Sequence, residues 1–108
     1  MRIWVDDIRT PPDKSWVWFK TSKDCIAELD SLKFFSGRTD RRPALMSLDH
    51  DLGGDDTTRP VVLWCCENDF WPVEVRVHSQ NPIGRDWLLG MIRRYHPTGA
   101  TNPERIEP

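Results

Sequence analysis

The side chains best suited to catalysis or ligand binding follow short apolar runs rich in β-branched and aromatic residues. Each run predicts a strand. Polar groups follow where each strand ends: Asp6 and Asp7, then Lys20 and Thr21, then Asp49, His50 and Asp51, and finally His78 and Ser79. In an open parallel sheet the carboxyl ends of all strands meet at one edge, where ligands bind. We therefore expect these groups to form one site.

Several carboxylates in one crevice repel one another unless a cation or bound protons offset their charge. Sites rich in oxygen suit Mg²⁺ or Mn²⁺, and a neighbouring histidine favours Mn²⁺ or another transition metal. We expect a divalent ion here. Its expected ligands are Asp6, Asp7, Asp49 and Asp51.

A mechanism without metal is the alternative. His50 and His78 would act as base and acid across a phosphorus centre, one activating water and the other protonating the departing ribose oxygen. Asp49 and Asp51 stand on either side of His50 and complete the expected catalytic set. His96 lies at the end of a predicted helix, where a structural role is the simpler interpretation.

The segment after the last predicted strand resembles an anion site. Asn81-Pro82 is a typical helix start, with Asn as the N-cap and Pro at the first helical position. Free amide groups at a helix N-terminus attract anions, Gly84 would let a ligand approach, and Arg85 can pair with phosphate. Ser79, Asn81, Gly84 and Arg85 are therefore expected to bind phosphate.

The elements that position these groups alternate along most of the chain. Strands are predicted at 2–5, 16–20, 44–48 and 73–77. Helices are predicted at 22–34, at 61–68 with Thr58 as the cap and Pro60 in the first turn, and from Pro82 to Tyr95. This order predicts an α/β fold with a parallel sheet of about four strands and three helices packed on its faces. The connection between the first two strands has no obvious helix, and residues 55–59 read as a mobile loop. The expected domain covers residues 1–97, followed by a loose tail at 98–108.

Composition narrows the classes of function. The chain has 108 residues, which suits one small domain, and 15 basic against 17 acidic residues argue against binding to extended duplex nucleic acid. No run approaches 18 apolar residues, and acidic residues by position 6 do not fit a signal peptide, so no membrane partner is expected. Three cysteines without a C-x-x-C spacing predict buried thiols in a reducing cytoplasm rather than disulfides or zinc.

Four motifs together resemble the cyclic-phosphate-processing receiver-like domains, which are relatives of response-regulator receivers. They are W-V-D-D-I-R, W-V-W-F-K-T, S-L-D-H-D-L-G and V-H-S-Q-N-P-I-G-R, and the resemblance covers residues 2 to about 95. It implies a flavodoxin-like sheet and action on cyclic phosphates of nucleotides or RNA ends. The site residues that it implies are Asp6, Asp7, Arg9, Asp49, His50, Asp51, His78, Ser79 and Asn81, with Lys20 as a weaker candidate.

The leading hypothesis is a phosphodiesterase that opens the cyclic phosphate of a nucleotide messenger or an RNA end. Arg9, Lys20 and Arg85 would then contact the phosphate. A second hypothesis is a module that sequesters a cyclic nucleotide without cleaving it, with Trp16, Trp18 or Trp71 stacked on a base. RNA repair, host signalling and viral counter-defence are all compatible settings.

Phosphoacceptor signalling is the third hypothesis. Asp6, Asp7, Asp49 and Ser79 occupy places comparable to those of ordinary receivers. A receiver also needs a lysine at the end of a fifth strand, and no fifth strand is evident. The lysines here all fall in the first third of the chain, which disfavours this hypothesis.

Overall fold

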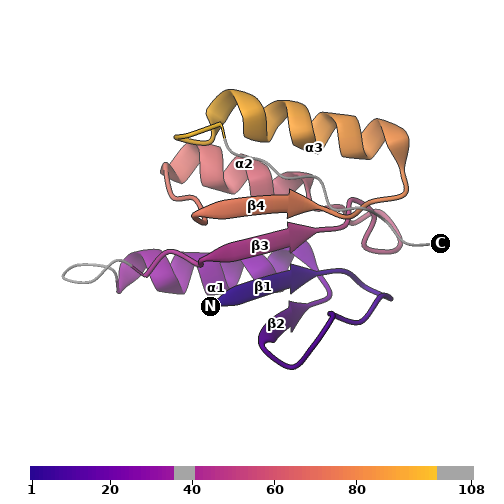
Figure 1. The fold of residues 1–108 in the computed structure, drawn as a ribbon, viewed down its shortest axis with the longest axis horizontal. Helices are drawn as coiled ribbons and strands as arrows, with labels where there is room; N and C mark the ends of the chain where they lie inside the picture. Colours follow the sequence, from indigo (N-terminus) through magenta and orange to yellow (C-terminus); the bar gives the residue numbers. More distant parts are fainter. Residues whose placement is uncertain (36–40, 100–108) are drawn as a thin grey trace.

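The computed structural model describes residues 1–35 and 41–99. Its elements are β1 (Arg2–Val5), β2 (Trp16–Phe19), α1 (Ser22–Phe34), β3 (Leu45–Leu48), α2 (Arg59–Asn68), β4 (Glu74–Val77) and α3 (Pro82–Tyr95). The strands form one parallel sheet in the order β2-β1-β3-β4 (Figure 1). The predicted α/β fold, with four parallel strands and three helices, is confirmed. Most of the predicted tail lies outside the described residues.

All three helices pack against the same face of the sheet. Ile3, Met46 and Val75 lie side by side in β1, β3 and β4, and they belong to one apolar core. The helix residues in that core are Cys25 and Leu29 of α1, Val61, Val62 and Cys65 of α2, and Leu88, Leu89 and Ile92 of α3. We expected helices on both faces, and the structure differs in this respect.

The reason lies in the direction of the crossovers. Parallel crossovers are almost always right-handed, and the steps β2 to β3 and β3 to β4 run the same way across the sheet. Their helices, α1 and α2, therefore fall on one face. The step from β1 to β2 runs the opposite way, and its connection at residues 6–15 contains no helix to cover the other face.

That connection instead folds over an aromatic cluster on the face opposite the helices. Trp4 of β1 stacks on the imidazole of His78, with ring centroids 3.9 Å apart, and meets the edge of Trp16. The Trp4 indole N–H donates to the carbonyl of Arg9 at 2.8 Å. These contacts bury Trp4 and hold the segment after β1 against the end of the sheet.

Two of the predicted helix starts are confirmed in detail. The Thr21 hydroxyl accepts the N–H of Asp24 at 3.1 Å at the start of α1. At the start of α3, the Asn81 side chain accepts the N–H of Gly84 at 3.1 Å. Thr58 precedes α2 as expected, but its hydroxyl makes no capping hydrogen bond.

The loop between β3 and α2 is tied to the rest of the protein, although it reads as mobile in the sequence. The Asp56 carboxylate accepts the backbone N–H and the hydroxyl of Ser22, at 2.9 and 2.6 Å. Its carbonyl accepts the N–H of Leu52 at 3.0 Å. This loop is therefore anchored to the N-terminus of α1.

The cysteines follow the prediction of unpaired thiols. Cys25 and Cys65 are buried, Cys66 is half-buried, and all three are free. Burial raises the pKa of the Cys25 thiol to about 12, which leaves it protonated and unreactive. Within the described part of the chain, no helix has the length and apolarity needed to cross a membrane.

Candidate functional site

The ends of β1 and β3 open into one pocket at the carboxyl edge of the sheet. Its volume is about 370 Å³. It is lined by Asp6, Asp7, Ile8, Arg9, Asp49, Asp51 and Gly53. Five of the predicted site residues thus meet around one hollow, as the convergence of parallel strand ends requires.

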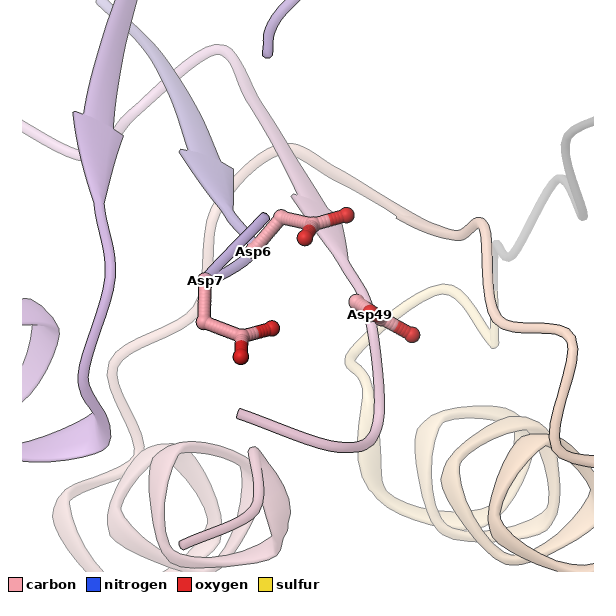
Figure 2. Close-up of side chains that lie close together, drawn as sticks. All are labelled: Asp6, Asp7 and Asp49. Atoms are coloured by element: carbon pink, nitrogen blue, oxygen red, sulfur yellow. The ribbon is translucent and has the colours of Figure 1, made fainter. Parts of the chain in front are cut away.

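Three carboxylates cluster inside this pocket. Asp6 and Asp7 follow β1 and Asp49 follows β3 (Figure 2). One carboxylate oxygen from each lies within 4.8 Å of the others. Gly53, with a φ of 85°, passes so close to Asp7 that a Cβ there would lie 3.0 Å from the Asp7 carboxylate. A glycine is therefore needed where the β3–α2 loop closes the pocket.

The Asp6 carboxylate is held by its own loop and by β4. One oxygen accepts the backbone N–H groups of Ile8 and Arg9, at 2.9 and 2.8 Å. The other oxygen lies 3.0 Å from Nε2 of His78. These contacts position Asp6 at the floor of the pocket, where its side chain is almost fully buried.

The surroundings of Asp49 disfavour the charged form of its carboxyl group. Its carboxylate accepts the N–H of His50 at 2.8 Å, and the Ser79 side chain lies close enough to favour the charged form. Burial nevertheless raises the pKa of the Asp49 carboxyl, and the negative charge of Asp6 raises it further. The hydrogen bonds and the Arg9 guanidinium only partly oppose this effect.

These three carboxylates fit a hard divalent cation. The donors are all oxygens, and their mutual repulsion is the kind that a bound Mg²⁺ or Mn²⁺ relieves. Asp7 accepts no hydrogen bond from the described residues, so its carboxylate is available to such an ion. Asp51, expected as a fourth ligand, lines the pocket but does not belong to the cluster.

The Asp51 carboxylate is instead held by two side chains that lie near the start of α3. Its two oxygens lie 2.8 Å from Nδ1 of His50 and 3.0 Å from the side-chain nitrogen of Asn81. Hydrogen bonding by His50, followed by that of Asn81, lowers the pKa of the Asp51 carboxyl. This carboxylate therefore stays ionised at the rim, where 60% of its side chain is exposed.

His78 is buried beside the pocket. Its Nε2 meets Asp6, and its Nδ1 lies 2.7 Å from the hydroxyl of Ser47. Its ring stacks on Trp4 and only 2% of the residue is exposed. His78 contacts a pocket residue without lining the pocket itself.

His50 is also enclosed, and its tautomer follows from its partners. The Nε–H of Arg59 donates to Nε2 of His50 at 2.9 Å. Since a guanidinium nitrogen only donates, Nε2 accepts, and the ring hydrogen on Nδ1 points to Asp51. Both ring nitrogens of both predicted catalytic histidines are thus hydrogen-bonded, which gives the two-histidine mechanism no geometric support.

The start of α3 differs from the predicted anion site. A Cβ at Gly84 would lie 2.3 Å from the ring of His50, so this glycine makes room for an imidazole rather than for a ligand. Its N–H is already capped by Asn81. Arg85 does not line the pocket, and its buried Nε has no hydrogen-bond partner among the described residues.

Lys20 and the tryptophans lie outside the pocket lining. The Lys20 ammonium sits 4.7 Å from the ring of Trp18, and the Trp18 indole N–H donates to the carbonyl of Asp6. Trp71 is buried in the core, which removes it as a platform for a base. Trp16 and Trp18 are partly exposed on β2.

Sequence reasoning missed several residues that shape this site. Arg59 contacts His50 from the first residue of α2, and no local pattern marks it. Ser47, in the middle of β3, reads only as a strand residue. Gly53 was the one detectable case, because L-G-G directly follows the D-H-D motif and signals a turn with positive φ.

Comparison with known families agrees with this geometry. A family model described as the cyclic-phosphate processing receiver domain matches residues 1–94. The chain belongs to this family. No curated protein and no solved structure matches it. Membership in the family implies a role in cyclic-phosphate processing by a receiver-like domain, and the predicted resemblance is confirmed.

Proposed function

We propose that this protein is a metal-dependent phosphodiesterase that opens cyclic phosphate linkages of a nucleotide or an RNA end. The observation that carries this proposal is the cluster of Asp6, Asp7 and Asp49 in a pocket that Arg9 also lines. A divalent ion and a guanidinium that face the same pocket commonly act together to bind and polarise a phosphate.

The chain's own residues would divide the work as follows. Asp6, Asp7 and Asp49 would hold Mg²⁺ or Mn²⁺, which when bound activates water and offsets the charge of the phosphate. Arg9 would hold the phosphate from the pocket wall. Its guanidinium is anchored there by a hydrogen bond of 3.3 Å to the carbonyl of His78, which leaves further N–H groups for the ligand.

Asp51 would act from the rim of the same pocket. Because His50 and Asn81 hold its carboxylate in one orientation, Asp51 is placed to accept a hydrogen bond from an attacking water or a ribose hydroxyl. Ile8, a pocket-lining residue that is 83% exposed, offers an apolar surface to the sugar or base. The pocket volume falls within the range of about 300–1,000 Å³ usual for small-molecule sites.

The test is turnover of defined substrates. Purified protein is incubated with cyclic mononucleotides, cyclic dinucleotides and RNA ending in a 2′,3′-cyclic phosphate, with Mn²⁺, Mg²⁺ or excess EDTA. We expect cleavage that EDTA abolishes and that Asp7→Asn loses, while Asp30→Asn on the exposed side of α1 retains it. Cleavage undiminished by EDTA would refute the metal route. Tight binding with intact ligand recovered would favour the sequestering alternative.

Phosphoacceptor signalling is a second candidate because the Ser79 side chain contacts Asp49 beside two further carboxylates. That arrangement suits transfer of a phosphoryl group to Asp49. Against it, none of the four lysines, Lys14, Lys20, Lys23 and Lys33, lines the pocket. Incubation with acetyl phosphate and Mg²⁺ tests it, since a phosphoacceptor would gain the mass of one phosphoryl group and Asp49→Asn would not.

A further inference from the structure

Arg59 has no part in the proposed chemistry, yet it makes specific contacts next to the site. It is the first residue of α2 and does not line the pocket. Its Nε–H donates to Nε2 of His50 at 2.9 Å. Its guanidinium carbon lies 4.7 Å from the centre of the Trp87 ring on α3, and this contact also holds the group in place.

From Arg59 a chain of hydrogen bonds runs to the pocket rim. Nδ1 of His50 lies 2.8 Å from one oxygen of Asp51, and the Asn81 amide donates to the other oxygen at 3.0 Å. The Asn81 side-chain oxygen in turn caps α3. Four side chains in series therefore connect the start of α2 with the start of α3, and the one that faces the pocket is Asp51.

We propose that Arg59 is a positioning residue for the pocket. By donating to Nε2 of His50 it keeps the ring hydrogen on Nδ1, and the imidazole then holds the Asp51 carboxylate at the rim. The effect on turnover rests on the proposed function. The effect on the hydrogen-bond chain does not.

The geometry leaves the imidazole little freedom. A neutral imidazole carries one hydrogen, which either nitrogen can hold. A hydrogen on Nε2 would face the Arg59 donor, and the Nδ1 lone pair would then face the carboxylate of Asp51. The ring also sits in the space left by the missing Cβ of Gly84. Its position is therefore set by packing, and its tautomer by the Arg59 donor on one nitrogen together with the Asp51 carboxylate on the other.

The chain offers a well-matched control. Arg94 also lies over an aromatic ring on α3, that of Tyr95 at 5.4 Å, but far from the pocket at the opposite end of the helix. Arg59→Met removes the donor while keeping an apolar stem against Trp87, and Arg94→Met makes the same chemical change at the control position. Arg59→Lys tests the need for the guanidinium, because an ammonium is a compact donor that does not reproduce the Nε–H geometry.

The first measurement is nitrogen NMR of the histidine rings and of the Asn81 side-chain amide at neutral pH. We expect the wild-type His50 signals to show hydrogen on Nδ1 with Nε2 accepting. In Arg59→Met and Arg59→Lys the signature of an accepting Nε2 is lost and the Asn81 amide signals shift, whereas Arg94→Met leaves both unchanged. A wild-type ring with its hydrogen on Nε2, or an Arg59→Met spectrum identical to wild type, would overturn the proposal. Arg59→Lys decides the question if Arg59→Met fails to fold.

The second measurement is kcat/KM for a cyclic phosphate that the wild type cleaves. Residues that orient a functional group typically contribute about 10–100-fold, so we expect Arg59→Met to lower kcat/KM about 10-fold. In an Asp51→Asn background the same change has no further effect, because Arg59 acts through Asp51. Additive losses would refute the positioning role. If nothing is cleaved, the proposed function fails, and the NMR result still decides whether Arg59 sets the tautomer.

Discussion

Replacing Asp49 by Asn should make the protein more stable and less able to bind a cation. The substitution removes one negative charge and keeps the shape of the side chain. The amide oxygen still accepts the N–H of His50, so the turn after β3 is retained. Any change in stability therefore reports mainly on the charge.

The size of the effect follows from Coulomb's law. At the 4.8 Å that bounds the oxygen separations in the cluster, two unit charges repel by about 3.5 kcal/mol at an effective dielectric constant of about 20, and by about 0.9 kcal/mol in water. Asp49 is half-buried and Arg9 offsets part of this repulsion. We expect Asp49→Asn to raise the free energy of unfolding by about 1–2 kcal/mol without metal, and Tm by about 4–8 °C per kcal/mol.

The pH dependence has a definite sign. Burial and the charge of Asp6 raise the pKa of Asp49 in the folded state. The contribution of Asp49 to stability is then most favourable below its unfolded pKa of about 3.9 and is lost as pH rises through the folded pKa. The stability advantage of Asp49→Asn should accordingly be full at neutral pH and shrink as the pH falls through that range.

Thermal unfolding with and without Mn²⁺ measures both effects. A ligand at one hundred times its Kd stabilises the folded state by about 2.7 kcal/mol. Saturating Mn²⁺ should therefore raise the Tm of the wild type and change the Tm of the Asp49→Asn variant little. The wild type should then have the higher Tm of the two, whereas without metal it has the lower. Asp30→Asn, the same change at an exposed position of α1, should follow the wild type throughout.

Two results would refute this reasoning. A metal-free Asp49→Asn protein less stable than the wild type would mean that repulsion does not dominate at this position. An equal response of both proteins to Mn²⁺ would mean that Asp49 is not a ligand, and the proposed metal centre would lose one of its three carboxylates.

Two further predictions concern the residues around the pocket. Gly84→Ala should lower the free energy of unfolding by about 1–3 kcal/mol because its Cβ would overlap the ring of His50. Gly90→Ala, on the open side of the same helix, should raise it by about 0.5–1 kcal/mol, and equal effects in urea unfolding would contradict this contrast. His78→Ala should lower it by about 3 kcal/mol or more, since it removes a buried ring stacked on Trp4, and a loss below about 1 kcal/mol in thermal unfolding would contradict a structural role.

The parts of the fold that local chemistry controls were predictable from the sequence. Runs such as Leu45–Leu48 bury their apolar side chains in a parallel sheet, and Asn81-Pro82 specifies a helix start by its own geometry. The meeting of Asp6, Asp7 and Asp49 followed from the rule that parallel strand ends share an edge. That rule depends only on the direction of the strands, and the alternation of strands and helices in the sequence already implies that the strands are parallel.

The partners of the polar side chains were not predictable in this way. His50 and Gly84 both looked like parts of a ligand site, but the ring of one fills the space left by the other. The contact depends on where the β3–α2 loop crosses the start of α3, which is a matter of tertiary packing. The contact of Arg59 with His50 was not predictable for the same reason. It depends on the β3–α2 loop folding back on itself, and no spacing of residues in the sequence indicates this.

The arrangement also explains why histidine, serine and asparagine recur in the motifs without lining the pocket. The histidines and Asn81 donate to carboxylates, His78 to Asp6 and His50 and Asn81 to Asp51, and the Ser79 side chain favours the charged form of Asp49. Hydroxyl, amide and imidazole groups can orient a carboxylate without the permanent positive charge of Lys or Arg. Lysines in these places would neutralise the pocket and weaken its attraction for a cation. Arg9 is the only Lys or Arg among the lining residues, so the cluster keeps the negative charge that a divalent ion needs.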